Sequence, residues 1–292
     1  PSPSRGQLVP AALTLWQREM VRFFRQRNRV IGAFATPVVF WVLLGSGLNQ
    51  AFDFPDRARS PEVLASPDRY LAGSDAVGPQ AAPGVHRSAG RMGYLEYLFP
   101  GALVMILLFT AIFSTISVID DRRDGFLQAV LVAPIPRLAV VGGKVLGGAS
   151  IAVIQGMVFL SIWPLIGGWS GWAAILSAVA IMFLLAIGLT ALGLCIAWAM
   201  DSAAGFHAVM NLLLFPMWFL CGAMFPPASA PAWLRVVMYA NPLTYGQAVL
   251  SATLHGPQAS AAAGVPLAVA GPLMIAFAAA VVALAAWVVS KP

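Results

Sequence analysis

Several long apolar runs, each of about 18 or more residues, constrain the fold of this chain more than any other feature. An α-helix needs about 20 predominantly apolar residues to cross the roughly 30 Å of hydrocarbon in a bilayer. Only 10% of the 292 residues are charged and 60% are hydrophobic, which lies outside the usual composition of a soluble domain. A β-barrel would need strands of about ten residues with alternating polarity, and no segment alternates in this way. The runs therefore predict an all-α integral membrane protein.

The apolar runs predict six transmembrane helices in a single membrane domain over residues 1–292. Pro37 falls inside the first of them, a position that membrane helices tolerate better than soluble ones. A polar segment without sustained periodicity, 49–93, follows the first run and is expected to be an extracytoplasmic loop. The six expected spans are 31–48, 95–119, 138–166, 172–199, 206–225 and 265–289.

An amphipathic segment, 11–29, precedes the first span. Its apolar residues recur at intervals of three and four, while its arginines occupy another face. Because the first span follows at once, the segment predicts a helix that lies in the membrane interface. The apolar face holds Leu13, Trp16, Met20 and Phe23, and the basic face holds Arg18, Arg22, Arg25 and Arg29.

Prolines divide the segment 226–256 into pieces too short to cross a bilayer. The segment is apolar enough to enter the membrane, but each piece between its prolines is shorter than about 17 residues. We therefore expect a re-entrant helical hairpin before the last span. The prolines are Pro226, Pro227, Pro231 and Pro242.

The distribution of Lys and Arg predicts the orientation in the membrane. With six spans, eleven of the 17 basic residues fall on the side of the N-terminus and six on the other side. We therefore expect both termini in the cytoplasm, and with them the charged segment 120–137 between the second and third spans.

The segment 120–137 combines a charge cluster with an apolar stripe. Phe126, Leu127, Val130 and Leu131 recur at helical spacing, and prolines follow them, which predicts a short helix outside the bilayer. An apolar stripe at this place needs a surface to cover it. The preceding acidic residues, Asp120, Asp121 and Asp124, are poorly matched to an anionic lipid surface, so the pattern favours a protein partner.

With these features the chain resembles the permease subunits of ABC-2-type ATP-binding-cassette exporters, over essentially its whole length. Members of that family carry a coupling helix between the second and third spans and a re-entrant hairpin before the last span. The matching residues here are Arg123-Asp124-Gly125-Phe126-Leu127, Val130-Leu131-Val132-Ala133-Pro134, Arg137, Gly143-Lys144 and Asn241-Pro242-Leu243-Thr244-Tyr245.

The resemblance implies that 120–137 is a coupling helix seated in a cleft of a separate P-loop ATPase. Its apolar stripe would fill the cleft, and Arg122, Arg123 and Asp124 would set the register by charge pairing. It also implies a second permease copy, either identical or related, in a bacterial plasma membrane. The residues implied for ATPase coupling are Asp121, Arg122, Arg123, Asp124, Gly125, Phe126, Leu127, Val130, Leu131, Pro134 and Arg137.

The residues around Gly143-Lys144 exclude a phosphate-binding loop at that place. A Walker A motif needs a glycine where Leu138 stands and Ser or Thr where Val145 stands. We therefore expect no enzyme and no cofactor in this chain, with ATP and Mg²⁺ on the partner subunit. Gly143 and Gly147 indicate close helix packing, and Lys144 is expected to extend its amine toward the cytoplasmic surface.

The resemblance also implies that the second and fifth spans line the translocation path. This nominates Phe109, Phe113, His207, Asn211, Phe215, Trp218 and Phe219. Aromatic faces suit an acyl chain or a drug ring, although lipid-facing and packing roles have the same composition, and His207 and Asn211 equally suit a hydrogen bond between helices. Outer-gate candidates are Trp233, Tyr239, Asn241, Pro242 and Tyr245. The Trp and the two Tyr residues could instead anchor in the headgroup layer.

Other classes of function receive less support from the sequence. The basic residues lie at the ends of apolar runs and not on a basic soluble domain, so nucleic acid is not an expected partner. No paired metal-ligand spacing occurs, so no metal site is predicted, and Cys195 and Cys221 fall near opposite ends of neighbouring spans, too far apart for a disulfide. The alternative to an export permease for an amphipathic, lipid-linked or drug-like substrate is a stand-alone channel or secondary transporter.

Overall fold

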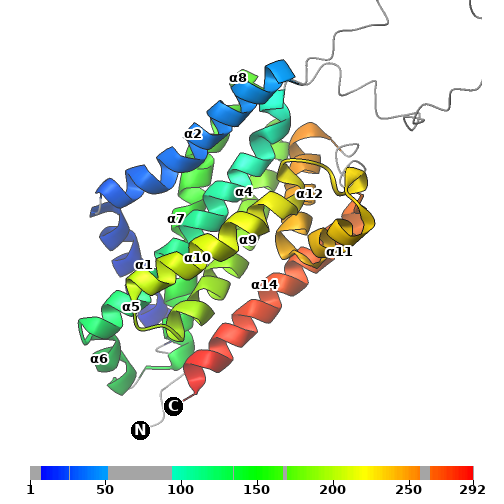
Figure 1. Cartoon of the computed structure of the whole chain (residues 1–292). Coiled ribbons are helices and arrows are strands. Elements are labelled where there is room, and N and C mark those ends of the chain that lie inside the picture. Colours follow the sequence, from blue (N-terminus) through cyan, green and yellow to red (C-terminus); the bar gives the residue numbers. More distant parts are fainter. Residues whose placement is uncertain are drawn as a thin grey trace, which may run out of the picture.

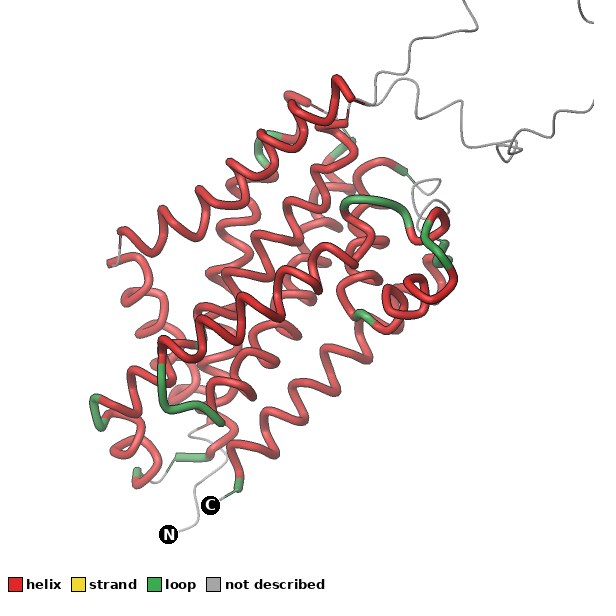
Figure 2. The backbone as a smooth tube through the Cα atoms, in the orientation of Figure 1, coloured by secondary structure: helices red, strands yellow, loops and turns green. Residues whose placement is uncertain are grey.

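The computed structural model describes residues 8–25, 27–51, 94–133, 135–166, 170–256 and 264–291. Every regular element in these ranges is helical, and no strand occurs among them. The expected extracytoplasmic loop lies outside the described residues from position 52 onward. Figures 1 and 2 show a bundle of long helices with short helices at both ends.

Five of the helical stretches are long and apolar enough to cross a membrane. The span expected at 95–119 is formed by α4, Tyr94–Ser114, and α5, Ile116–Arg123, and the last span is α14, Leu267–Ser290. The three stretches between them are α7, Arg137–Leu160, with α8, Trp163–Ile166; α9, Trp172–Trp198; and α10, Ala203–Trp218, which continues as the π-helical turn η4, Phe219–Ala223.

The first expected span, 31–48, corresponds to α2, Arg27–Ala51. Among its described side chains the apolar stretch covers only Pro37–Gly47, so α2 is not one of the five long apolar stretches. It nevertheless packs along α4, where Trp41 Nε1 donates to Leu95 O at 3.0 Å. Within the described residues, five of the six predicted spans thus appear as helices long and apolar enough to cross a membrane.

Helix α4 forms the centre of the bundle (Figure 1). It packs against α2, α7, α9, α10 and α12, and is buried along nearly its whole length. Its beginning lies in an aromatic cluster in which Phe99 stacks on Phe159 at 4.6 Å between ring centroids, with Trp41 and Trp163 beside them. Burial of this apolar surface against neighbouring helices fixes the position of α4 in the bundle. Helix α5, which carries charged residues, follows α4 directly.

The expected interfacial helix is α1, Leu8–Arg25, and it packs tightly against α7. Leu15, Glu19 and Phe23 form its buried face. Close approach is possible because α7 presents glycines: a Cβ on Gly143 would lie 2.6 Å from Leu15 Cβ, and one on Gly147 would lie 2.9 Å from Glu19 Cβ.

Two short helices follow η4, at the end of the bundle opposite the C-terminal end of α14 (Figure 1). After the 3₁₀ turn η5, Pro227–Ser229, come α11, Ala232–Ala240, and α12, Pro242–His255, of 9 and 14 residues. Asn241 begins α12 by accepting a hydrogen bond from Leu243 N, and Pro242 occupies the first helical position, where its missing N–H costs nothing. Neither helix is long enough to cross a bilayer.

The charged segment 120–137 differs from the single helix that we expected. Its first four residues belong to α5, which continues the second span, and the separate helix is only α6, Phe126–Val132. Gly125 joins the two with a φ of 75°, a left-handed conformation that glycine adopts without strain. The charged residues from Asp120 to Arg123 therefore lie on α5 and not on the short helix, and Asp124 follows α5 directly.

Candidate functional site

The short helix α6 turns most of its apolar stripe toward the chain itself. Leu127 is 3% exposed and belongs to the main core cluster, and Phe126 and Val130 are partly buried against the same cluster. The Arg18 guanidinium of α1 lies 3.7 Å from the centroid of the Phe126 ring, a cation–π contact. The structure thus differs from the expectation that this stripe fills a partner's cleft, because Phe126, Leu127 and Val130 pack against the chain itself.

A different surface of α6 is open to a partner. Val132 is 87% exposed, and Gln128 and Ala129 are exposed beside it. Arg123 and Asp124, just before the Gly125 turn, are also exposed. The side chain of Leu131 and the whole of Pro134, both predicted to contact the ATPase, lie outside the described residues.

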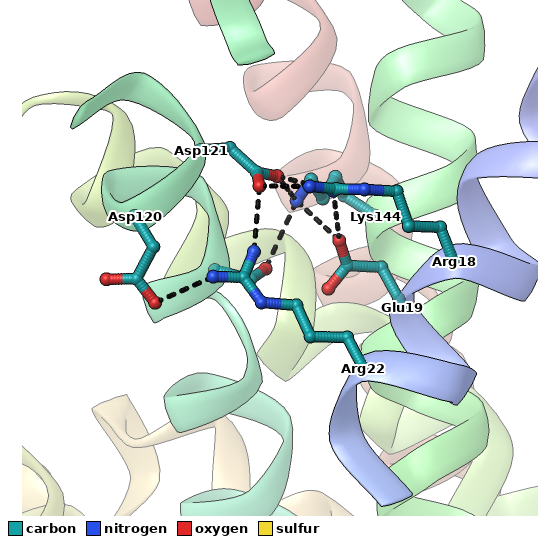
Figure 3. Close-up of polar contacts among 7 residues, drawn as sticks. Arg18, Glu19, Arg22, Asp120, Asp121 and Lys144 are labelled. Atoms are coloured by element: carbon teal, nitrogen blue, oxygen red, sulfur yellow. Dashed lines mark hydrogen bonds and ion pairs between the residues drawn. The ribbon is translucent and has the colours of Figure 1, made fainter. Parts of the chain in front are cut away.

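Asp121 lies at the centre of a buried charge cluster that joins α1, α5 and α7 (Figure 3). Its carboxylate is inaccessible to solvent and accepts hydrogen bonds from Arg18 at 3.0 and 2.7 Å, from Arg22 at 2.7 Å, and from Lys144. The bond to Asp121 raises the pKa of the Arg18 guanidinium above its usual value, so this side chain remains charged. The resemblance had implied Asp121 as an ATPase contact, and in this chain its carboxylate is buried among Arg18, Arg22 and Lys144.

Lys144 completes the cluster from α7. It is 5% exposed, donates to Glu19 Oε1 at 2.6 Å and to Ser117 Oγ at 3.2 Å, and bonds to Asp121. The expectation that its amine reaches the surface is therefore wrong, because two carboxylates neutralise the amine inside the bundle. Arg22 extends the cluster outward to Asp120 at 3.2 Å.

The neighbouring arginines also contact the chain itself. Arg122 donates to Trp198 O at 2.7 Å and to Asp201 Oδ1 at 2.9 Å, and Arg123 donates to Asp201 O at 3.0 Å. These bonds tie the end of α5 to the turn between α9 and α10. Arg137, another predicted ATPase contact, donates to three carbonyls at the end of α14, those of Val289, Ser290 and Lys291. Such contacts satisfy the free carbonyl groups of a helix end.

Helix α10 has one buried and one open face. The buried face repeats at every fourth residue and consists of Phe206, Met210, Leu214 and Trp218. The open face includes the two polar residues of this helix, His207 and Asn211. It also holds Leu212 and Phe215, and Phe219 at the start of η4 is exposed as well. All of these except Leu212 are predicted path residues. Phe113 from α4 reaches this face, with its ring 4.9 Å from that of His207.

The predicted path residues do not all share that open face. Phe109 is 9% exposed and contacts the Phe215 ring at 5.4 Å, so it underlies the face. Trp218 is buried and donates from Nε1 to Gly101 O at 2.8 Å, which makes it a packing residue between α10 and α4. The periodicity of α10 did not predict this difference, because its residues are apolar on both faces.

A groove of about 310 Å³ separates α10 from α11 and α12. Its walls are apolar apart from one amide side chain, that of Asn241. The lining residues are Leu212, Leu213, Pro216, Met217, Leu220, Val237, Ala240, Asn241 and Pro242. Asn241 Nδ2 donates to Met217 O at 2.6 Å, so the amide holds α12 against α10.

The other predicted gate residues divide between packing and exposure. Tyr245 Oη donates to Tyr239 O at 2.6 Å and joins α12 to α11, whereas Tyr239 Oη contacts Gly264 O at 3.4 Å. Trp233 is 70% exposed on α11. Tyr245 and Asn241 therefore stabilise the hairpin, and Trp233 remains free to contact lipid or a second chain.

Sequence reasoning missed the acidic and basic partners within α1. Arg18, Arg22 and Glu19 were assigned to a helix on the lipid surface, yet all three point into the bundle toward Asp121 and Lys144 (Figure 3). The one available signal was Glu19, an acidic residue within a basic face. No group of three His, Cys, Asp or Glu residues suited to a metal ion occurs in the described part of the chain.

Comparison with known proteins gives one consistent result. Residues 10–255 match the model of a membrane-protein family described as ABC-2 type transporter. The chain is 28% identical over 155 residues to the ycf38 transport permease of Cyanophora paradoxa, an alignment that covers 52% of this chain and 53% of that protein. The chain thus spans about half the length of this relative.

Two bacterial proteins show similar resemblance. The daunorubicin resistance ABC transporter permease protein DrrB1 of Streptomyces coeruleorubidus is 19% identical over 187 residues, which cover 63% of this chain and 66% of that protein. Nodulation protein J of Rhizobium leguminosarum bv. viciae is 26% identical over 195 residues, which cover 66% of this chain and 73% of that protein.

Proposed function

This chain belongs to the ABC-2 type transporter family as a multi-pass permease subunit, and on that premise we propose that it forms an ATP-driven export path for an amphipathic, lipid-linked or drug-like substrate. Permeases of this family are not catalytic, and ATP is hydrolysed on a separate subunit. ATP and Mg²⁺ would accordingly bind the partner. The name of the DrrB1 relative, a daunorubicin resistance ABC transporter permease protein, supports a drug-like substrate.

The open face of α10 is the observation that carries the proposal. Polar groups that face lipid are costly, so a membrane helix is expected to turn them toward protein or a water-lined path. His207 and Asn211 lie on this face among Phe215 and Phe219, a combination that suits a substrate with polar and apolar parts. We infer that a second permease copy covers the face and that the substrate passes between the two copies.

The exposed surface of α6 supports the coupling to an ATPase. Val132, Gln128 and Asp124 offer an apolar contact flanked by polar groups, and all three are open in this chain. We propose that this surface, in place of the covered Phe126 and Leu127, contacts the ATPase cleft.

We propose the following placement in the plasma membrane. Helix α2 is the sixth span, because it runs beside α4 and its 25 residues are sufficient to cross the bilayer. The hairpin of α11 and α12 enters the outer leaflet. The end that carries α6 and the end of α14 faces the cytoplasm, in agreement with the distribution of basic residues.

Co-purification with the P-loop ATPase encoded beside the gene tests this function. We expect a stoichiometric complex in mild detergent that is lost with Val132→Asp, because a carboxylate would be buried at the contact. Leu165→Asp is the matched control: Leu165 is 86% exposed, close to the 87% of Val132, but it lies on α8 at the opposite end. Reconstituted complex should then export substrate only with ATP.

Two outcomes would contradict the proposal. A well-folded chain that never binds an ATPase would favour the stand-alone channel or secondary transporter. Equal ATPase binding by both aspartate variants and the native chain would exclude the exposed surface of α6 as the contact.

A further inference from the structure

The second span contains an irregular turn just above its charged end. Helix α4 ends at Ser114 and α5 begins at Ile116. Between them Thr115 N donates to Ile112 O at 3.0 Å and Val118 N donates to Thr115 O at 2.9 Å, which are the bonds of a 3₁₀ turn. The hydroxyl groups of Ser114 and Thr115 both bond to carbonyls three positions earlier, an arrangement that bends helices. Such a turn within a long helix commonly marks a hinge.

Below this turn, hydrogen bonds between charged groups join α5 to α1 and to α7. Asp121 is inaccessible to solvent and holds Arg18, Arg22 and Lys144, which come from two other elements. Lys144 also forms an ion pair with Glu19, which joins α7 directly to α1. Separating these elements would leave buried charges without partners.

Helix α6 is attached to the same group of elements. Arg18 bonds to Asp121 and also stacks on Phe126, so one side chain of α1 contacts both α5 and α6. Leu127 is buried in the core beside them. The open surface of α6, with Val132 and Gln128, faces away from this attachment.

The use of charges here favours a mechanical role. Well-packed apolar residues of similar volume often stabilise a protein as much as a buried ion pair does or more, whereas an ion pair specifies direction and is costly to break. We propose that α1, α5 and α6 move as one body about the Thr115 turn when the ATPase displaces α6, with Asp121 as the positioning residue that carries the movement to α1 and to the adjoining end of α7. This inference rests on the proposed coupling of α6 to an ATPase.

Distances between spin labels test the proposal in the complete complex with its ATPase. Labels at the exposed positions Gln17 of α1, Gln128 of α6 and Val236 of α11 report three separations, in a chain in which Cys195 and Cys221 are replaced by alanine. Each pair would be measured without nucleotide and with ATP trapped on the ATPase.

We expect the separations of Gln128 and Gln17 from Val236 to shift together on ATP binding, while the Gln17 to Gln128 separation stays constant. In Asp121→Asn, the Gln17 to Gln128 distribution should broaden and the shift at Gln17 should be lost. Asp120→Asn is the matched control, because Asp120 is partly exposed and contacts only the outer edge of the cluster through Arg22, so its distances should match those of the native chain.

The native complex alone can overturn the proposal, even if Asp121→Asn fails to fold. A Gln17 to Gln128 separation that changes as much as the Gln128 to Val236 separation would show that α1 and α6 move independently, with ATPase coupling intact. No nucleotide-dependent change at Gln128 would overturn the proposed coupling together with this inference.

Discussion

Asp121 accepts hydrogen bonds from both terminal nitrogens of Arg18, at 3.0 and 2.7 Å, across 103 positions of the chain. This two-point contact between a planar guanidinium and a carboxylate is among the stronger and more directional interactions available to side chains. It joins α1 to α5, at the end of the stretch that α4 and α5 form. Asp121, one of the three acidic residues that led us to expect a partner surface, is therefore part of the internal structure of the permease, whereas Asp124 is exposed.

Removal of Asp121 should strongly destabilise the chain. Asp121→Ala leaves Arg18 and Lys144 without their buried partner, and breaking such a pair typically costs about 3–5 kcal/mol of the free energy of unfolding. Asp120→Ala removes one partly exposed pair and should cost no more than about 1 kcal/mol. Thermal unfolding in detergent measures both, and equal transition temperatures would contradict the assigned difference.

The packing of α1 on α7 should tolerate no side chain at Gly143. In Gly143→Ala the new Cβ would lie 2.6 Å from Leu15 Cβ and 3.0 Å from Ala12 O, so α1 must shift. Overpacking of this kind costs about 1–3 kcal/mol. Gly142→Ala is the control, because its Cβ would meet only Ala12 Cβ at 3.8 Å. A lower unfolding temperature for the first variant alone is expected, and the reverse order would contradict the packing.

Loss of an aromatic ring from the open face of α10 should weaken transport without weakening assembly. Phe215 is 43% exposed there, and an aromatic contact is worth about 0.5–1.5 kcal/mol, which corresponds to about a 2- to 12-fold loss of export rate at low substrate concentration in Phe215→Ala. ATPase binding should be unchanged. Leu176→Ala, at an exposed site on α9, should export at the native rate. An equal loss in both variants would argue against a path along α10.

The end of the bundle that carries α12 should lose stability as the pH falls. Burial lowers the pKa of His255 below its usual value of 6.5. Hydrogen bonds with the backbone of Glu96 and of Ser251 oppose this effect. The unfolded chain therefore binds the proton more readily, so stability decreases as the pH falls below about 6.5.

Unfolding temperatures of the native chain and of His255→Gln, measured between pH 7.5 and about pH 5, test this dependence, because glutamine does not titrate in this range. We expect a steeper decrease for the native chain. Parallel curves would mean that protonation of His255 does not contribute.

The sequence by itself determined the long helices of this protein. Hydropathy over about 20 residues is a local property, so the span expected at 172–199 appears as Trp172–Trp198, and the one expected at 265–289 appears as Leu267–Ser290. Pro242 likewise predicted the break between α11 and α12, because proline acts on adjacent residues.

Only the tertiary structure decided what each charge and each short helix contacts. The seven residues of α6 show an apolar stripe, but a stripe does not specify whether a partner or the chain's own α1 covers it. Lys144 and Asp121 were each placed at the surface because an isolated charge near a helix end is most stable there. Their burial depends on Glu19 and Arg18, and the glycines of α7 allow α1, which carries both, to approach closely. Charges that neutralise each other across such long separations in the chain produce no periodic pattern in the sequence.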